Sequence, residues 1–435
     1  MPRELHAVLA SGPTTGNVLR GQIGVSQPTL SRLLTQHRST IAKLGRGRAT
    51  RYALYRRIRE LPAELPVMRV STIGGVMRIG TLATIAANAL WFDDLEDPRA
   101  SREYLSLPWF ITDMRPQGYL GRLFPAMHED LGLPGPVTDW NEDQTLYAIA
   151  RRGEDVVGNL LVGEESMARF LTGFVAEAAY FHGSRLERYG STADYVAGGG
   201  GAGSSAAGEQ PKFTACVREP GRASRRVIVK FSGTLDTAAG RRWADLLIAE
   251  HLATEVLREH GYVAARTEFL SDGRRAYLEI ERFDRLGERG RIGLVSLRAL
   301  DDGFVGERRG WPESAAALLR ERLIAAEAAV ELRWLSAFGA HIANNDMHLG
   351  NVSFFHDGAR QLRLAPVYDM LPMAYAPARD EVPTREPAAP VPRSGHSDQW
   401  LAAGQVAQRY WRRLADDERL SEEFRAVARQ HLQFY

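Results

Sequence analysis

The pattern of apolar residues at the N-terminus predicts three short helices that follow one another closely. One helix is expected over Leu5–Ala10 and a second over Gly16–Ile23, each ended by glycine. A third helix is expected to begin after Ser26, because serine is a good N-cap and Pro28 suits a first helical turn. Short helices joined by tight turns are the first sign of a helix-turn-helix unit.

The third helix is predicted to have one apolar face and one polar face. Leu30, Leu33 and Leu34 recur at the spacing of a helical stripe, which we expect to be buried. The opposite face carries side chains that can reach base edges or phosphates of DNA, namely Gln27, Thr29, Ser31 and Arg32.

A basic hairpin is predicted behind this helix. Thr40–Leu44 and Ala49–Tyr55 read as strands on either side of a Gly-Arg-Gly-Arg turn that contains Arg46 and Arg48. A helix-turn-helix followed by such a hairpin is typical of a winged helix-turn-helix domain. Its third helix would lie in the major groove, and Arg46 and Arg48 would lie on the phosphates or in the minor groove. A three-helix module that binds protein is the alternative.

Charge is distributed unevenly along the chain. Residues 1–60 contain eleven Lys or Arg against two acidic residues, a local net charge of +9. The whole chain has a net charge of +2, so the remaining residues carry −7. A basic segment on an acidic body favours a module that binds a polyanion, and duplex DNA is the expected partner. A solvated basic face is the alternative.

The composition is that of an ordinary globular protein. Of 435 residues, 44% are hydrophobic and 25% are charged, which suits two or three domains with a buried core. The single cysteine, Cys216, excludes an intramolecular disulfide and fits a reducing compartment. No apolar stretch approaches the roughly 20 residues that a membrane helix needs. We therefore expect a cytoplasmic protein with no membrane partner.

Lysine is rare in this chain, and its positions are informative. Of 55 basic residues 52 are arginine, and the lysines are Lys43, Lys212 and Lys230. Arginine cannot replace lysine where one compact ammonium must fit against a phosphate. Lys212 follows a Gly/Ser-rich run that lacks the Walker arrangement, and Lys230 lies near the end of the β-branched strand Arg226–Phe231. Both are candidates for phosphate contact, with chance as the alternative.

The chain after Lys230 continues in the order of a protein kinase. A long amphipathic helix is predicted over Trp243–His260, and it contains Glu250 and Glu255. A strand lysine paired with a helix glutamate holds the nucleotide phosphates in protein kinases. The next strand, Ala276–Arg285, lies where a hinge would present backbone groups to adenine.

The strongest chemical signal lies further on, around Asp346 and Asn351. Kinase catalytic loops place a base aspartate five residues before a metal-binding asparagine, and these two residues have that spacing. Eighteen residues after Asn351, Asp369 ends a strand and supplies a second ligand for Mg²⁺. Phosphoryl transfer needs metal ions, a lysine and an orienting carboxylate, and Lys230 completes that set. A buried loop that these residues only stabilise is the alternative.

Four motifs follow in a characteristic order: the Ser-x-x-Gly-x-Gln-x-Lys loop Ser205–Lys212, the hinge Glu281–Arg285, the segment Asn344–Asn351 and the pair Tyr368-Asp369. With them the chain resembles the HipA-like serine/threonine kinases, the toxins of bacterial toxin–antitoxin pairs. The resemblance covers about residues 70–435. Two departures stand out. A DNA-binding-like segment is fused to the kinase, and Met347 stands where the family often has an acidic residue.

The resemblance implies a role for each motif residue. Lys230 would contact the ATP phosphates, and Glu281 and Phe283 would hold adenine. Asp346 would be the catalytic base, and Asn351 and Asp369 would bind Mg²⁺. ATP contacts are expected from residues of all four motifs: Gly208, Glu209, Gln210, Lys212, Lys230, Glu281, Phe283, His348, Asn351, Tyr368 and Asp369.

The resemblance also implies regulation and partners. Ser205 would be a site of autophosphorylation that ejects its loop and stops the enzyme. Known targets of the family include aminoacyl-tRNA synthetases, so a protein substrate of that kind is expected, and a separate antitoxin is a further expected partner. Because a single winged helix reads a short DNA site, useful affinity is expected to require either a homodimer or a second DNA-bound partner.

The predicted fold is α+β, a bilobal protein-kinase-like fold of HipA type preceded by a small winged helix-turn-helix domain. The expected domains are residues 1–62 for DNA binding, 63–285 for an N-terminal subdomain and the small lobe, and 286–435 for a mainly helical large lobe. Two other functions stay open. The loop around Asp346 also resembles that of aminoglycoside and choline kinases, and a kinase-like body could serve a transcription regulator as a sensor.

Overall fold

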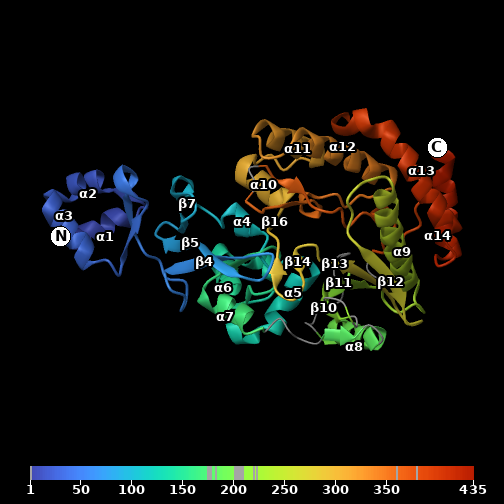
Figure 1. Cartoon of the computed structure of the whole chain (residues 1–435), viewed down its shortest axis with the longest axis horizontal. Helices are drawn as coiled ribbons and strands as arrows, with labels where there is room; N and C mark the ends of the chain where they lie inside the picture. Colours follow the sequence, from blue (N-terminus) through green and yellow to red (C-terminus); the bar gives the residue numbers. More distant parts are fainter. Residues whose placement is uncertain are drawn as a thin grey trace. The chain divides into compact units, whose positions relative to one another are not determined.

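The computed structural model describes residues 2–173, 179–181, 184–199, 210–218, 221, 224–358, 361–378 and 381–435. The chain forms two compact units (Figure 1). Unit 1 comprises Met1–Arg115 and Thr138–Val175, and unit 2 comprises Pro116–Val137 and Ala176–Tyr435. Within the residues described, no helix has both the length and the apolar character needed to cross a membrane.

Unit 1 begins with three helices and a hairpin, in the predicted order. Its first elements are α1 (Pro2–Leu9), β1 (Thr14–Thr15), α2 (Gly16–Ile23), α3 (Gln27–Gln36), β2 (Ile41–Leu44) and β3 (Arg51–Leu54). Ser26 caps α3 as expected, because its side chain accepts a hydrogen bond from Thr29 N. Leu30 of the predicted stripe is buried in a cluster with residues of α1 and α2, and Leu33 and Leu34 pack against it.

Two boundaries in this region differ from the predicted ones. Helix α1 begins at Pro2 and ends at Leu9, so it starts three residues before the predicted Leu5. The second strand of the hairpin begins at Arg51 rather than at Ala49, because Gly47–Ala49 form one turn of 3₁₀ helix. The Arg-containing turn is therefore longer than the strand pattern suggested.

The rest of unit 1 is a five-stranded antiparallel sheet in the order β7-β6-β5-β4-β8 with three helices. These elements are β4 (Glu64–Val70), β5 (Val76–Ile85), β6 (Ala89–Asp94), β7 (Arg102–Tyr104), β8 (Leu160–Val162), α4 (Trp109–Thr112), α6 (Glu142–Arg152) and α7 (Glu164–Leu171). Phe170 of α7 packs against Val70 and Leu161 of the sheet. Runs of buried residues along β4 and β5 supply the core of the sheet.

The N-terminal hairpin shares a core with this sheet. Ala42 and Leu44 of β2 and Ala53 of β3 lie in one buried cluster with Ile85 of β5 and Trp91 of β6. The backbone continues the contact, since Arg56 N donates to Thr84 O at 2.9 Å and Ala86 N donates to Leu54 O at 2.9 Å. The first 55 residues are therefore packed on the sheet that follows them. We call this contact the hairpin–sheet core.

Unit 2 contains a five-stranded sheet in the order β12-β13-β11-β10-β9, with helices on both faces. Its elements are α5 (Gly118–Met127), β9 (Ala179–Phe181), α8 (Arg185–Gly199), β10 (Lys212–Arg218), β11 (Arg225–Phe231), α9 (Ala238–Glu259), β12 (Thr267–Ser271) and β13 (Ala276–Glu281). Val227, Val229 and Phe231 of β11 pack in the cluster that contains α8. Because side chains alternate along a strand, Lys230 faces the other side, where α9 lies.

The remainder of unit 2 is mainly helical and carries two small sheets. Figure 1 shows α11 to α14 gathered together in orange to red. The elements are β14 (Arg285–Leu286), β15 (Gly290–Arg291), β16 (Leu294–Ser296), α10 (Leu297–Phe304), α11 (Trp311–Arg320), α12 (Ala326–His341), β17 (Ser353–Phe355), β18 (Arg363–Leu364), α13 (Trp400–Asp416) and α14 (Glu422–His431). The segment 342–352, between α12 and β17, is the predicted catalytic loop.

Candidate functional site

Lys230, Glu250 and Asp369 form a compact ionic cluster. Lys230 Nζ lies 2.7 Å from each carboxylate oxygen of Glu250 and 2.5 Å from Asp369 Oδ1. The side chains of Lys230 and Glu250 are buried, whereas that of Asp369 keeps 26% of its exposure. One ammonium group is thus fixed by two carboxylates that come from a helix and from a distant loop.

The charges of the cluster determine its protonation. Burial alone would raise the pKa of Asp369, but the ammonium groups of Lys230 and Lys212 outweigh it and lower this pKa to about 2. Burial would lower the pKa of Lys230, yet the two carboxylates raise it above its ordinary value. Burial raises the pKa of Glu250 despite the attraction of Lys230. Asp369 is therefore a carboxylate and Lys230 an ammonium at neutral pH.

The loop that carries Asp346 is closed by its own asparagines. Asn351 Nδ2 donates to Asp346 O at 2.8 Å, and Asp346 N donates to Asn344 Oδ1 at 3.1 Å. Asn344 Nδ2 in turn donates to Asp369 O at 3.3 Å. These bonds tether the loop to the ionic cluster, while Asp346 itself stays exposed.

Tyr368 and His348 support the end of this loop. Tyr368 OH donates to Gly350 O at 2.9 Å and lies 2.8 Å from Ser353 Oγ. His348 Nδ1 accepts from Gly350 N at 3.1 Å, and Trp311 Nε1 donates to His348 O at 3.0 Å. Two side chains from outside the loop, Tyr368 and Trp311, therefore hold its C-terminal part.

The predicted hinge lies beside Tyr368. Strand β13 ends at Glu281 and does not run on to Arg285 as predicted, because Arg285 N donates to Arg282 O at 3.1 Å and closes a tight turn. The ring of Phe283 lies 5.9 Å from that of Tyr368 and 6.1 Å from that of Phe355. Phe283 thus joins the predicted hinge to β17, the strand that follows the predicted catalytic loop.

Lys212 lies closer to the ionic cluster than its sequence neighbourhood indicated. It is the first residue of β10 rather than part of the Gly/Ser-rich loop, and it is the register partner of Lys230 on β11. Its charge also lowers the pKa of Asp369. Gln210 just before it is buried, and its Nε2 has no hydrogen-bond partner among the residues described. Ser205, Gly208 and Glu209 lie outside the described residues.

Sequence reasoning left the partner of Lys230 undecided between Glu250 and Glu255. Glu255 lies five residues further along α9, on a different face, where it is 3.6 Å from His251 Nε2. Sequence reasoning gave no role to Asn344 or to Ser353. Asn344 begins the motif Asn344–Asn351, and its position two residues before Asp346 is one at which an asparagine side chain can bond the backbone locally.

The residues present fit a magnesium ion. In the part of the chain that the structure describes, no group of three or more His, Cys, Asp or Glu could hold a metal. Mg²⁺, however, usually takes only one or two protein ligands and completes its shell with phosphate oxygens and water. Because the Asn351 amide already donates through Nδ2, its oxygen is left for another ligand. Asp369 is ionised and partly exposed, so both predicted ligands suit the ion.

The predicted DNA-binding side chains lie on the surface of unit 1. Gln27, Ser31 and Arg32 of α3 are exposed, as are Arg46 and Arg48 of the hairpin turn. Thr29 is half-buried, and its hydroxyl lies 3.0 Å from that of the capping Ser26. Five of the six side chains are thus accessible, and the Thr29 hydroxyl instead contacts the capping residue of α3.

Comparison with known proteins gives two family matches and one close relative. Residues 61–171 match a family described as the middle domain of YjjJ-like toxins, and residues 204–433 match the HipA-like C-terminal domain. Toxin YjjJ of Escherichia coli strain K12 is 36% identical over 443 residues, which cover 98% of this chain and 96% of the relative.

Solved structures give the fold. HipA of Shewanella oneidensis MR-1, in a complex with HipB and its operator DNA, superposes with a TM-score of 0.52 at 16% identity, covering 85% of this chain and 95% of HipA. The Helicobacter pylori proinflammatory kinase CtkA gives a TM-score of 0.37 at 12% identity, covering 53% and 88%. The likeness to HipA confirms the predicted kinase-like fold of HipA type.

Proposed function

Because this chain belongs to the HipA-like toxins, we propose that it is a protein kinase that transfers the γ-phosphoryl group of ATP to a serine or threonine of another protein. The observation that carries the proposal is the ionic cluster of Lys230, Glu250 and Asp369 tethered to the loop of Asp346. Phosphoryl transfer asks little covalent chemistry of a protein. It requires fixed charges around the phosphates and an oriented hydroxyl.

Each residue of the cluster has a role in this proposal. Lys230, held by Glu250, would contact the ATP phosphates, and Asp369 and Asn351 would hold Mg²⁺. The bound ion would neutralise charge on the phosphate oxygens. Asp346, exposed near the middle of a braced loop, would orient the acceptor hydroxyl and receive its proton.

The remaining predicted nucleotide contacts surround this cluster. Glu281 and Phe283 would hold adenine, Tyr368 would fix the loop beneath it, and Lys212 would add a second ammonium near the phosphates. Gly208, Glu209, Gln210 and His348 complete the proposed set. Ser205 would be the autophosphorylation site that switches the enzyme off. The register of β10 and β11 supports the phosphate contact proposed for Lys212, because it puts Lys212 opposite Lys230.

The kinase proposal is tested by incubating the full chain with labelled ATP and Mg²⁺, followed by mass spectrometry of the chain and of a cell lysate. Phosphate on Ser205 and on a lysate protein such as an aminoacyl-tRNA synthetase is the expected result. Asp346→Asn, which keeps the size of the side chain, should abolish transfer and leave ATP binding nearly unchanged. Transfer to a small molecule alone would support the small-molecule kinase, and ATP binding without transfer would support a sensor body.

DNA binding by the N-terminal residues is the second part of the proposal. Five of the six predicted side chains are exposed, and the first 60 residues carry a net charge of +9. The Shewanella HipA structure contains HipB and operator DNA, so an antitoxin and DNA are proposed as partners of this chain as well. Gel-shift titration of the full chain at two salt concentrations tests this part. Affinity should fall steeply with salt, and no binding at low salt would contradict it.

A further inference from the structure

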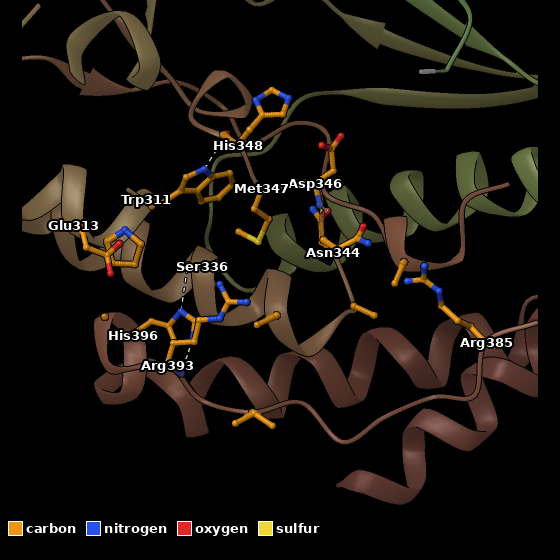
Figure 2. Close-up of a pocket in the computed structure, with 18 residues that line it drawn as sticks. Trp311, Glu313, Ser336, Asn344, Asp346, Met347, His348, Arg385, Arg393 and His396 are labelled. Atoms are coloured by element: carbon orange, nitrogen blue, oxygen red, sulfur yellow. Dashed lines mark hydrogen bonds between the residues drawn. The ribbon is translucent and has the colours of Figure 1, made fainter. Parts of the chain in front are cut away.

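A cavity of about 730 Å³ opens beside Asp346 within unit 2. Figure 2 shows its walls, which come from the start of α11, from the end of α12 with the catalytic loop, and from the segment 385–396. Its volume falls in the range of about 300–1,000 Å³ that is usual for ligand sites. The cavity therefore has room for several side chains of a bound segment.

The cavity is distinct from the proposed nucleotide contacts. Of the proposed site residues that the structure describes, Asp346 and His348 line it, whereas Lys230, Asn351 and Asp369 do not. A kinase base stands between its two substrates, because it must reach the hydroxyl that attacks the γ-phosphate. A cavity that touches Asp346 but not Lys230, Asn351 or Asp369 is therefore suited to the acceptor rather than to the nucleotide.

The catalytic-loop wall of the cavity is firmly built. Met347 lies directly on α12, because a Cβ at Gly339 would come within 2.2 Å of its Sδ atom and the methionine side chain would have to move. Trp311 lies at the start of α11 and bonds His348 O at 3.0 Å. With Ala340, these residues form an apolar surface below the base.

Two arginines bring positive charge to the opposite wall. Arg385 and Arg393 are exposed, and their side chains point into the cavity (Figure 2). Elsewhere in unit 2 arginines are commonly ion-paired, as Arg333 is with Asp398 at 3.0 Å. Within the described ranges, neither Arg385 nor Arg393 makes an ion pair or a side-chain hydrogen bond. Their guanidinium groups are therefore available to a ligand, and guanidinium prefers carboxylates and phosphates.

We infer that this cavity binds the segment of the protein substrate that carries the acceptor hydroxyl, and that it selects segments with acidic residues beside the acceptor. The inference rests on the proposed kinase function. An extended chain advances about 3.3 Å per residue, so residues within a few positions of the acceptor lie in the cavity when the hydroxyl is at Asp346. Arg385 and Arg393 would then pair with acidic side chains of that segment, and the Trp311–Met347 surface would hold an apolar one.

Negative charge in the cavity comes from Asp346 itself and, at the end away from the base, from Glu313. The Glu313 carboxylate lies against the backbone of Gly310 and Gly395, where a Cβ would come within 2.8 Å and 2.9 Å of its oxygens. Glu313 would repel acidic residues at that end of the cavity and attract basic ones. Acidic residues are therefore expected to be preferred on the side of the acceptor that faces Arg385 and Arg393. The preference depends on where an acidic residue lies in the peptide and not on the total charge of the peptide.

The test uses the full chain with Mg–ATP and three sets of serine peptides, whose flanking residues are glutamate, lysine or alanine. The kcat/KM for the glutamate set should exceed that for the alanine set by roughly tenfold, since two partly exposed ion pairs are gained. Arg385→Glu with Arg393→Glu should reverse the order of the glutamate and lysine sets. The KM for ATP should be unchanged, because neither residue is among the proposed nucleotide contacts.

Arg320→Glu is the matched control. Arg320 is exposed on α11 but does not line the cavity, so the same charge change there should leave the peptide order unaltered. Three results in an unaltered chain that still autophosphorylates would overturn the inference. They are equal use of the three peptide sets, a preference for the lysine set, and transfer to no peptide. Loss of autophosphorylation and of all other transfer in the unaltered chain would instead refute the proposed kinase function.

Discussion

Replacing Lys230 by methionine should destabilise the fold as well as stop phosphoryl transfer. The Lys230 ammonium is the shared partner of Glu250 and Asp369, with distances of 2.7 Å and 2.5 Å. Methionine fills a similar volume but leaves the Glu250 carboxylate buried at 1% exposure without its cation. Removing one partner of a buried ion pair costs about 3–5 kcal/mol, because the remaining charge cannot reach water.

The pH dependence of this loss follows from Glu250. Without Lys230, burial and the neighbouring Asp369 raise the pKa of Glu250 in the folded state above its unfolded value. A carboxyl group shifted in that direction destabilises the fold at high pH, and the penalty fades as the pH falls toward the unfolded pKa. The difference in unfolding free energy between the wild type and Lys230→Met should therefore be larger at about pH 8 than at about pH 5.

A double substitution separates the two effects. Glu250→Gln in the Lys230→Met background removes the buried charge, so urea unfolding at about pH 8 should regain most of the lost stability. Phosphoryl transfer should stay absent, because the phosphates still lack their ammonium. A loss of stability that is the same at both pH values, or that Glu250→Gln does not reduce, would refute the electrostatic reasoning. Circular dichroism of each variant gives the control for folding.

Three further outcomes are expected. Lys212→Ala should lower kcat by about tenfold or more, as Lys212 lies opposite the lysine of the ionic cluster; an unchanged rate in the peptide assay would remove it from the site. Tyr368→Phe loses the bond to Gly350 O and should cost about 1 kcal/mol in thermal unfolding, with a lower kcat at unchanged KM for ATP. Arg32→Ala should reduce discrimination between DNA sites by about 1–3 kcal/mol, whereas Arg46→Ala should weaken all duplexes alike in gel-shift titrations.

The sequence predicted best those features that depend on local spacing. In the strand that carries Lys230, every second residue is a valine or a phenylalanine, and these residues share one face. The lysine therefore had to lie on the other face. The five-residue spacing of Asp346 and Asn351 likewise sufficed to place both in one loop, where they are joined by a hydrogen bond. Ser26 marked the start of α3 for the same reason, since a cap acts within three residues.

Features that depend on distant contacts could not be predicted. The choice of Glu250 over Glu255 required the position of α9 across β11, which no local pattern contains. Lys212 was assigned to the Gly/Ser-rich loop because the strand register that pairs it with Lys230 is a property of the sheet. The cavity beside Asp346 was missed because Arg385 and Arg393 lie in an irregular segment that carries no periodic signal.

The hairpin–sheet core limits where the chain can be cut into folded fragments and which substitutions it can accept during evolution. A fragment cut near residue 60 would expose Ala42, Leu44 and Ala53 to water, so recombinant pieces should keep the first 55 residues together with Ile85 and Trp91. The same contact restricts evolution. A larger side chain on one surface of this core requires a smaller one on the other, so the two regions are expected to be inherited as one piece and not exchanged between proteins.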